Sequence, residues 1–259
     1  MIICCGCSYT RYKYPCWPAY VQWFEKEEVK NLGASGSANE TVMRSLYNAV
    51  HKYGKKISKM LVMWTGTHRY EIVQDEIDAV AKKDELVTYS RWNDDFQWNQ
   101  FHGGHYYSDK HDFYVRHIQN ERQNEIRLLE RILFAQMFLS RHKIDYQMMV
   151  YRNNILSHDK EKMTLGHRAV YDDVDWTKFI FWKKFGGLDE FANDQHPEQF
   201  NRPYDLHPLP LAHYHWVKDV MYRSTTECPK DEYEKMANWK KTSVFHDEDN
   251  ARIRENERS

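Results

Sequence analysis

The sequence contains no long hydrophobic run, and this absence argues against a membrane-spanning helix. A helix that crosses a bilayer needs about 20 predominantly apolar residues, and no stretch of this 259-residue chain reaches that length. The first residues also lack a basic segment followed by a long apolar segment, so we expect no signal peptide. The sequence therefore predicts a cytoplasmic protein that has no membrane partner.

An excess of charge of one sign is also missing. The chain has 37 Lys and Arg residues against 38 Asp and Glu residues, which gives a formal net charge of -1. A protein without a basic surplus has no general attraction to nucleic acids or to acidic membranes. We therefore predict that nucleic acid is not a partner.

Paired cysteines that would indicate a disulfide framework are absent too. Of the five cysteines, all but Cys228 lie within the first sixteen residues, and no second pair follows Cys4-x-x-Cys7. We interpret Cys4 and Cys5 as small apolar residues of a strand, with free thiols in a reducing compartment. Metal or redox chemistry at Cys4 and Cys7 is the alternative interpretation. The His-rich stretch at 101–111 could bind metal but is interpreted as an aromatic surface loop, so we predict no metal centre.

Short apolar runs alternate with helical patterns along the chain. We predict strands at about residues 1–5, 29–32, 59–64 and 145–151, and helices at about 18–26, 38–53, 115–142 and 211–223. Ser37 followed by Glu40 matches a capping box at the start of the second helix. This alternation indicates a parallel sheet with helices on both faces. The expected fold is α/β, a three-layer α/β/α sandwich with about five strands.

Two aromatic stretches interrupt this alternation. Residues 70–113, with a predicted helix over 71–83, and the irregular residues 152–204 are interpreted as insertions above the carboxyl edge of the sheet. There they could wall a binding site. Residues 224–259 are polar and form a predicted C-terminal tail with some helix. The main domain is therefore expected to span residues 1–223.

Ser8 follows the first predicted strand, where open α/β folds place their ligands. Gly6 permits a tight turn at the end of that strand. A serine becomes a nucleophile when a histidine accepts its proton and donors hold the oxyanion that forms. An ordinary turn serine is the alternative interpretation.

Four short blocks stand at the ends of predicted strands or before the last helix. They are GCSYT at residues 6–10, NLGASG at 31–36, GTHR at 66–69 and DLHP at 205–208. Their order and spacing resemble those of the SGNH, or GDSL-like, hydrolase superfamily, over about residues 1–222. Phage and bacterial proteins that begin with GCS(F/Y)T are the most similar. The resemblance implies a flavodoxin-like topology and a serine esterase that needs no cofactor.

The resemblance also implies a role for each matching residue. Ser8 would be the nucleophile, His207 the general base and Asp205 the acid that orients His207. The N–H groups of Ser8 and Gly33, together with the imidazole of His68, would stabilise the oxyanion. Asn39 and Arg69 would support the site from behind, with a helix cap and a salt-bridge partner as their alternative roles. The substrate class implied is a small acyl ester, such as an O-acetylated glycan.

The sequence departs from the pattern of the superfamily at three places. Cys7 replaces the usual Asp of the first block, and His68 stands where the third block usually has an oxyanion-binding Asn. Asp205 and His207 are separated by one residue instead of two, and Gly33 or the DLHP block could simply shape loops. These departures motivate a second hypothesis, a catalytically degenerate binding or structural protein associated with a phage virion or its assembly. Such a protein would reside in the host cytoplasm or the virion.

Overall fold

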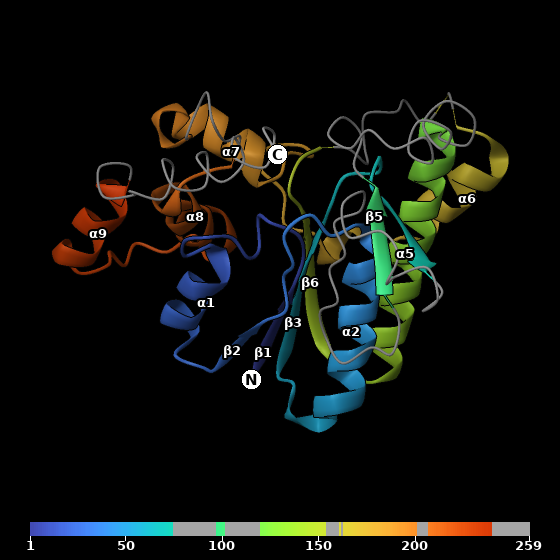
Figure 1. The fold of residues 1–259 in the computed structure, drawn as a ribbon, viewed down its shortest axis with the longest axis horizontal. Helices are drawn as coiled ribbons and strands as arrows, with labels where there is room; N and C mark the ends of the chain where they lie inside the picture. The colour runs from blue at the N-terminus through green and yellow to red at the C-terminus, as the bar shows by residue number, and fades with distance from the viewer. Residues whose placement is uncertain (75–96, 102–119, 154–160, 162, 201–206, 240–259) are drawn as a thin grey trace, which may run out of the picture.

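The structure is a computed structural model that describes residues 1–74, 97–101, 120–153, 161, 163–200 and 207–239 (Figure 1). Its strands are β1 (Ile2–Cys5), β2 (Val29–Asn31), β3 (Lys59–Trp64), β4 (Tyr70–Gln74), β5 (Gln97–Phe101) and β6 (Asp145–Val150). Its helices are α1 (Trp17–Glu25), α2 (Asn39–Tyr53), α5 (Glu121–Arg141), α6 (Leu165–Asp173), α7 (Leu188–Gln195), α8 (Pro210–His215), a π-helix (Trp216–Met221) and α9 (Lys230–Ala237). Across these residues, no helix is both long enough and apolar enough to cross a membrane.

The main sheet consists of four parallel strands in the order β2-β1-β3-β6. β1 lies between β2 and β3, so that Ile2 pairs with Val29 on one side and with Lys59 on the other. The chain runs outward from β1 to β2 and then returns to β3 on the opposite side of β1. The direction of winding therefore reverses between β1 and β3, which is where open α/β sheets form their ligand sites. The segment after β1, which carries Ser8, begins at this point.

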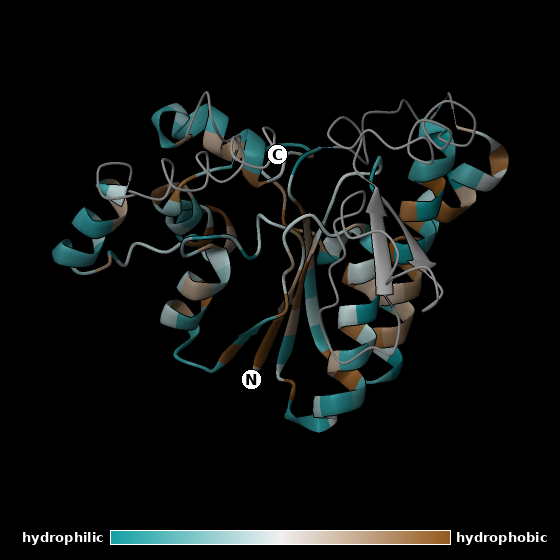
Figure 2. Cartoon of the chain, in the orientation of Figure 1, coloured by the Kyte–Doolittle hydropathy of each residue, from teal (hydrophilic) through white to brown (hydrophobic). Residues whose placement is uncertain are grey.

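Helices cover both faces of this sheet. α2 and α5 pack on one face, whereas α1, α7 and the π-helix pack on the other (Figure 1). Successive side chains of β1 alternate between the two layers, with Ile3 and Cys5 on the first face and Ile2 and Cys4 on the second. Because both layers are apolar, β1 is hydrophobic at every position, as Figure 2 shows by its brown colour. The predicted α/β class, with a parallel sheet that has helices on both faces, is confirmed.

The predicted fifth strand is not formed in the described part of the chain. A single parallel bridge joins Phe179 to Met148 of β6, and the Ile180 N–H donates to the Met148 carbonyl at 2.8 Å. A 3₁₀ turn at Trp176–Lys178 comes just before this bridge, and an antiparallel bridge between Trp182 and Gly186 turns the chain back just after it. The extended segment is therefore too short to build a ladder along β6.

The loop before α2 also differs from the prediction. Residues 39–53 are helical as expected, but the N-cap is Ala38, and Ser37 does not cap the helix. The Ser37 hydroxyl instead lies 2.8 Å from the Ala34 carbonyl and 3.2 Å from the Gly6 carbonyl. The predicted capping box is wrong because the Ser37 hydroxyl points back to these two carbonyls and not to the N–H groups at the start of α2. Ser37 thus joins this loop to the end of β1.

Both predicted insertions contain regular structure. In the first insertion, β4 pairs with β5 in the antiparallel direction. The helix predicted over 71–83 is therefore wrong for 71–74. Residues 75–96 and 102–113 of this insertion lie outside the described residues. Residues 152–204 are not uniformly irregular, since α6 packs against α5 and α7 packs on the sheet. In the predicted tail, Met236 of α9 packs against Leu211 and Tyr214 of α8.

Gly187, which precedes α7, gives a test of this packing. A Cβ at this position would lie 2.2 Å from the Val150 carbonyl oxygen and 2.7 Å from the Tyr151 carbonyl oxygen. Since backbone cannot move aside cheaply, we expect Gly187→Ala to lower the free energy of unfolding by about 1–3 kcal/mol. The measurement is urea unfolding followed by circular dichroism.

Gly166→Ala is the matched control for this prediction. Gly166 lies in α6, and no atom is within 4 Å of the position its Cβ would take. Replacing this helical glycine by alanine should stabilise the protein by about 0.5–1 kcal/mol. Equal effects of the two substitutions would contradict the close approach of α7 to the end of β6.

Candidate active site at the end of the first strand

Ser8 lies in a tight turn that follows β1. The N–H groups of Thr10 and Arg11 both donate to the Cys7 carbonyl, at 2.9 and 3.1 Å. The Thr10 side chain folds back so closely that a Cβ on Gly6 would lie 2.0 Å from its hydroxyl oxygen. Glycine is therefore required at position 6, and the turn holds Ser8 with only 4% of its surface exposed.

His207, distant in sequence, contacts this serine. The Nε2 atom of His207 lies 2.7 Å from the Ser8 Oγ atom, which is a hydrogen-bonding distance. His207 is half-buried and stands just before Pro208, whose carbonyl accepts a hydrogen bond from the Tyr14 hydroxyl at 2.8 Å. The structure thus brings the two principal predicted residues together in the geometry that a nucleophile and its base require.

Two tyrosines of the Ser8 segment hold the His207 ring. Tyr12 stacks on it with a centroid distance of 4.4 Å and an interplanar angle of 14°, and Tyr9 approaches it at 5.1 Å. Stacking restricts rotation of the imidazole and so maintains its direction toward Ser8. The sequence alone did not predict this role. The signal was the aromatic spacing just after Ser8, but only the fold shows which ring these residues contact.

Tyr9 also belongs to a polar network that the sequence did not reveal, in which Tyr9 and Asp189 are buried and Arg152 is exposed. The Tyr9 hydroxyl donates to Asp189 Oδ1 at 2.6 Å, and Arg152 Nε donates to Asp189 Oδ2 at 2.9 Å. Burial raises the pKa of Tyr9 well above its usual range, and the neighbouring Asp189 carboxylate raises it further. The phenol therefore stays protonated and anchors the Ser8 segment to α7.

The predicted oxyanion donors have other contacts. The Gly33 N–H donates to the Asn31 side chain at 2.9 Å, and a Cβ at Gly33 would lie 2.8 Å from Thr10 carbon atoms. The glycine thus permits close packing against the Ser8 turn. The His68 ring lies against Gly66, where an added Cβ would be 2.5 Å from its Cε1 atom. The His68 ring therefore packs on the backbone of its own loop, at Gly66.

The electrostatic surroundings of His68 are positive. Burial lowers the pKa of its imidazole, and the charges of Arg69 and Arg152 lower it further. Both guanidinium groups lie beside the Tyr151 ring, at 5.9 and 5.8 Å from its centroid. His68 is consequently favoured as a neutral group with one N–H donor.

Asn39 and Arg69 tie the surrounding loops together. The buried Asn39 side chain accepts from the Thr65 N–H at 2.9 Å and donates to the Thr65 carbonyl at 3.1 Å. Arg69 donates to the Ser37 carbonyl at 3.1 Å. Both residues therefore connect the segment around the third block to the residues that follow the second block. Asp205 lies outside the described residues, so its predicted role stays a prediction.

The fold and this pair define an α/β sandwich protein with a serine–histidine pair at the end of its first strand. The chain belongs to a family of unknown function, DUF6071, which matches residues 7–224. No curated protein matches the sequence. The matched region includes Ser8 and His207 and ends before α9.

A second histidine near the site provides a pH-dependent test. His213 is buried, and its Nδ1 atom accepts the Trp17 N–H at 3.3 Å. Burial, and secondarily the nearby His207, lowers the pKa of His213 to about 3, whereas a histidine in an unfolded chain titrates near 6.5. The stability contributed by neutral His213 is therefore fully present above about pH 6.5 and is lost as the pH falls toward 3.

We expect His213→Gln to reduce the slope of unfolding free energy against pH by about one proton in this range. Denaturant unfolding between pH 6.5 and 4 measures the slope, and His213→Asn serves as a second variant if the first does not fold. His51→Gln, at an exposed position of α2, should keep the wild-type slope. A wild-type slope in both His213 variants would show that His213 is not the acid-sensitive group.

Proposed function

We propose that this protein is a serine esterase of the SGNH type that hydrolyses small acyl esters. The observation that carries the proposal is the 2.7 Å separation between Ser8 Oγ and His207 Nε2. Support also comes from the resemblance of the four sequence blocks. In addition, the strand order β2-β1-β3-β6 is the order of the first four strands of a flavodoxin-like sheet.

The reaction follows from this pair. Ser8 Oγ attacks the ester carbonyl carbon while His207 Nε2 accepts the hydroxyl proton. The tetrahedral intermediate then breaks its bond to the alcohol oxygen, which leaves with the proton from His207. Water, deprotonated by His207, attacks the acyl carbon. The bond to Ser8 Oγ then breaks, His207 returns the proton to Ser8, and the acid is released. Tyr12 keeps the imidazole in line throughout, and Asp205 is the proposed acid that orients it.

Oxyanion stabilisation is the step that requires rearrangement. The proposed donors are the N–H groups of Ser8 and Gly33, with the His68 imidazole in place of the usual Asn. The Gly33 N–H must exchange its bond to Asn31 for one to the substrate. Because loss of one donor typically lowers kcat by about 10²–10³-fold, we propose a slow esterase. An O-acetylated glycan is the substrate that the resemblance favours.

A binding or structural protein that retains only the fold is the second candidate. It is favoured by the 4% exposure of Ser8 and by the occupied N–H of Gly33. Such a protein would keep the serine–histidine contact as a structural hydrogen bond. The two candidates differ in whether Ser8 reacts with an electrophile.

A fluorophosphonate probe distinguishes these candidates by intact mass. We expect the wild-type protein to gain one label and Ser8→Ala to gain none. His207→Gln should label at least about 100-fold more slowly, since general-base assistance contributes about 10²–10⁴-fold. Hydrolysis of short-chain acetyl esters should follow the same order among the variants.

Ser35→Ala is the matched control for the labelling experiment. Ser35 lies in the second block and its hydroxyl contacts the Arg11 carbonyl at 3.1 Å, so it shares the neighbourhood but not the histidine. This variant should label like the wild type. Absence of labelling in folded wild-type protein, as judged by circular dichroism, would contradict the esterase and support the binding protein.

A further inference from the structure

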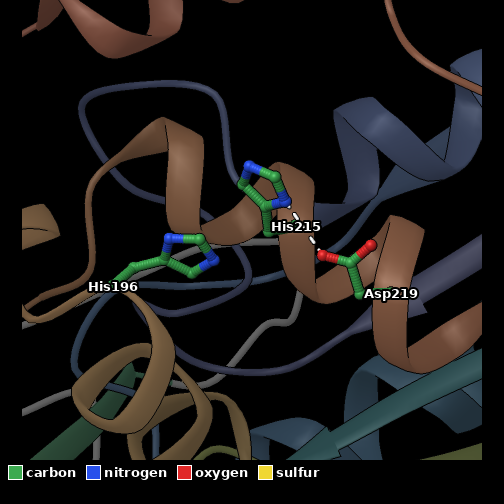
Figure 3. Close-up of side chains that lie close together, drawn as sticks. All are labelled: His196, His215 and Asp219. Atoms are coloured by element: carbon green, nitrogen blue, oxygen red, sulfur yellow. Dashed lines mark hydrogen bonds and ion pairs between the residues drawn. The ribbon is translucent and has the colours of Figure 1, made fainter.

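Three metal-ligating side chains converge beside α8, away from the contacts of Ser8 described above. His196 caps the C-terminal end of α7, His215 ends α8, and Asp219 lies one helical turn later in the π-helix (Figure 3). One ligand atom from each of the three lies within 4.8 Å of the other two. Two segments of chain thus supply two imidazoles and a carboxylate to one place.

The local backbone explains why these groups meet. His215 and Asp219 are four residues apart on one helical face, and His215 Nδ1 lies 2.9 Å from Asp219 Oδ2. The helix is of the π type from Trp216 to Met221, a rare conformation that occurs frequently at functional sites. His196 enters from α7 and stacks on His215 with a centroid distance of 4.4 Å and an interplanar angle of 23°.

Burial and charge suit a bound cation. The two imidazole side chains are 19% and 15% exposed, whereas the Asp219 side chain is 43% exposed, so the cluster is shielded but reachable from solvent. An imidazole nitrogen that carries no proton offers the lone pair that a metal needs.

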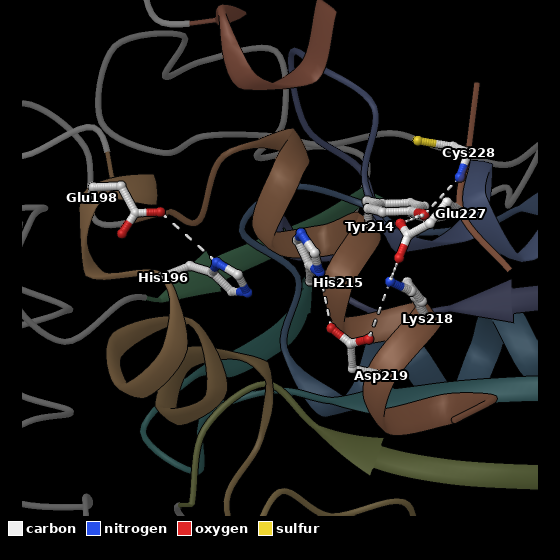
Figure 4. A network of polar contacts seen from close by, with 8 residues as sticks. All are labelled: His196, Glu198, Tyr214, His215, Lys218, Asp219, Glu227 and Cys228. Carbon is white, nitrogen blue, oxygen red and sulfur yellow. Dashed lines mark hydrogen bonds and ion pairs between the residues drawn. The ribbon is translucent and has the colours of Figure 1, made fainter. Parts of the chain in front are cut away.

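Three charged side chains surround the cluster, namely Glu198, Lys218 and Glu227 (Figure 4). Lys218 pairs with Glu227, and its Nζ atom is 3.9 Å from Asp219 Oδ1, the oxygen that does not face His215. Glu198 Oε1 lies 3.8 Å from His196 Nδ1, where it can orient that ring. Lys218 therefore contacts one carboxylate oxygen of Asp219 and leaves the other to the two histidines.

We propose that His196, His215 and Asp219 bind one divalent transition-metal ion of the zinc class. Two imidazoles and a carboxylate match the preferences of Zn²⁺, and three protein ligands leave one position for water. His207 lies in the sequence between His196 and His215, and the Leu209 N–H donates to the Gln199 carbonyl within the same stretch. The ion would therefore join α7 to α8 across the segment that carries His207, whether or not Ser8 is catalytic.

Zinc titration of the chelator-stripped full chain tests the site. The chain has 14 histidines, and others among them can also bind zinc. The site is therefore tested by comparing the zinc affinity of variants with that of the wild type. We expect His215→Gln and Asp219→Asn each to lower the affinity of one zinc equivalent by at least about tenfold, since even partners of metal ligands contribute about 10–100-fold. Zinc should raise the thermal midpoint of the wild type and have a smaller effect on the variants.

His51→Gln and Asp173→Asn are matched controls, because both residues are exposed and lie on α2 and α6. They should bind zinc and respond to it like the wild type. Equal zinc affinity and equal thermal shifts in all folded variants would overturn the proposal. Because no ester is involved, this result is independent of the labelling of Ser8.

Discussion

The burial of β1 and β3 on both faces is the constraint on which the structure depends. Ile2 and Ile3 are at most 1% exposed, and every residue from Met60 to Trp64 is fully buried. Removing this apolar surface from water on both sides favours one arrangement, in which helices cover both layers. Parallel strands then end at the same edge. The loops after β1, β2 and β3 meet at this edge because the three strands are parallel neighbours in the sheet.

Polar contacts connect these loops to one another and form a frame around the Ser8 turn. Ser37 joins the second loop to Gly6, and Asn39 joins the start of α2 to Thr65. Asn39 pairs both the N–H and the carbonyl of Thr65, which are buried backbone groups that need partners. The Ser37 hydroxyl adds a second donor to the Gly6 carbonyl, which also accepts the Ala34 N–H at 3.0 Å. The frame fixes the turn of Ser8, whereas His207 arrives from the distant connection between α7 and α8. The serine–histidine contact thus joins the end of the first strand to a segment close to the end of the domain.

The aromatic residues make this long-range contact specific. Tyr12 covers one face of the His207 ring, and Tyr9 links the same turn to Asp189 of α7. An aromatic ring contributes a large contact area with few rotatable bonds, and a phenol adds one directed hydrogen bond. The high aromatic content of the chain, 15%, therefore serves partly to hold the site. The same packing continues toward α8, where His213 is buried and His215 turns outward to Asp219.

The sequence by itself determined the four parallel strands, the α/β/α layers, the main helices and the candidacy of Ser8 and His207, because each rests on local periodicity or on a short block. It did not determine that the Ser37 hydroxyl bonds to the carbonyls of Gly6 and Ala34. It also predicted about five strands, whereas the main sheet of the described residues has four, because the extended segment beside β6 turns back at Trp182. It also did not show the Tyr9–Asp189–Arg152 network or the meeting of His196 with Asp219. Those contacts join segments that only packing brings together, so the tertiary structure alone decided them.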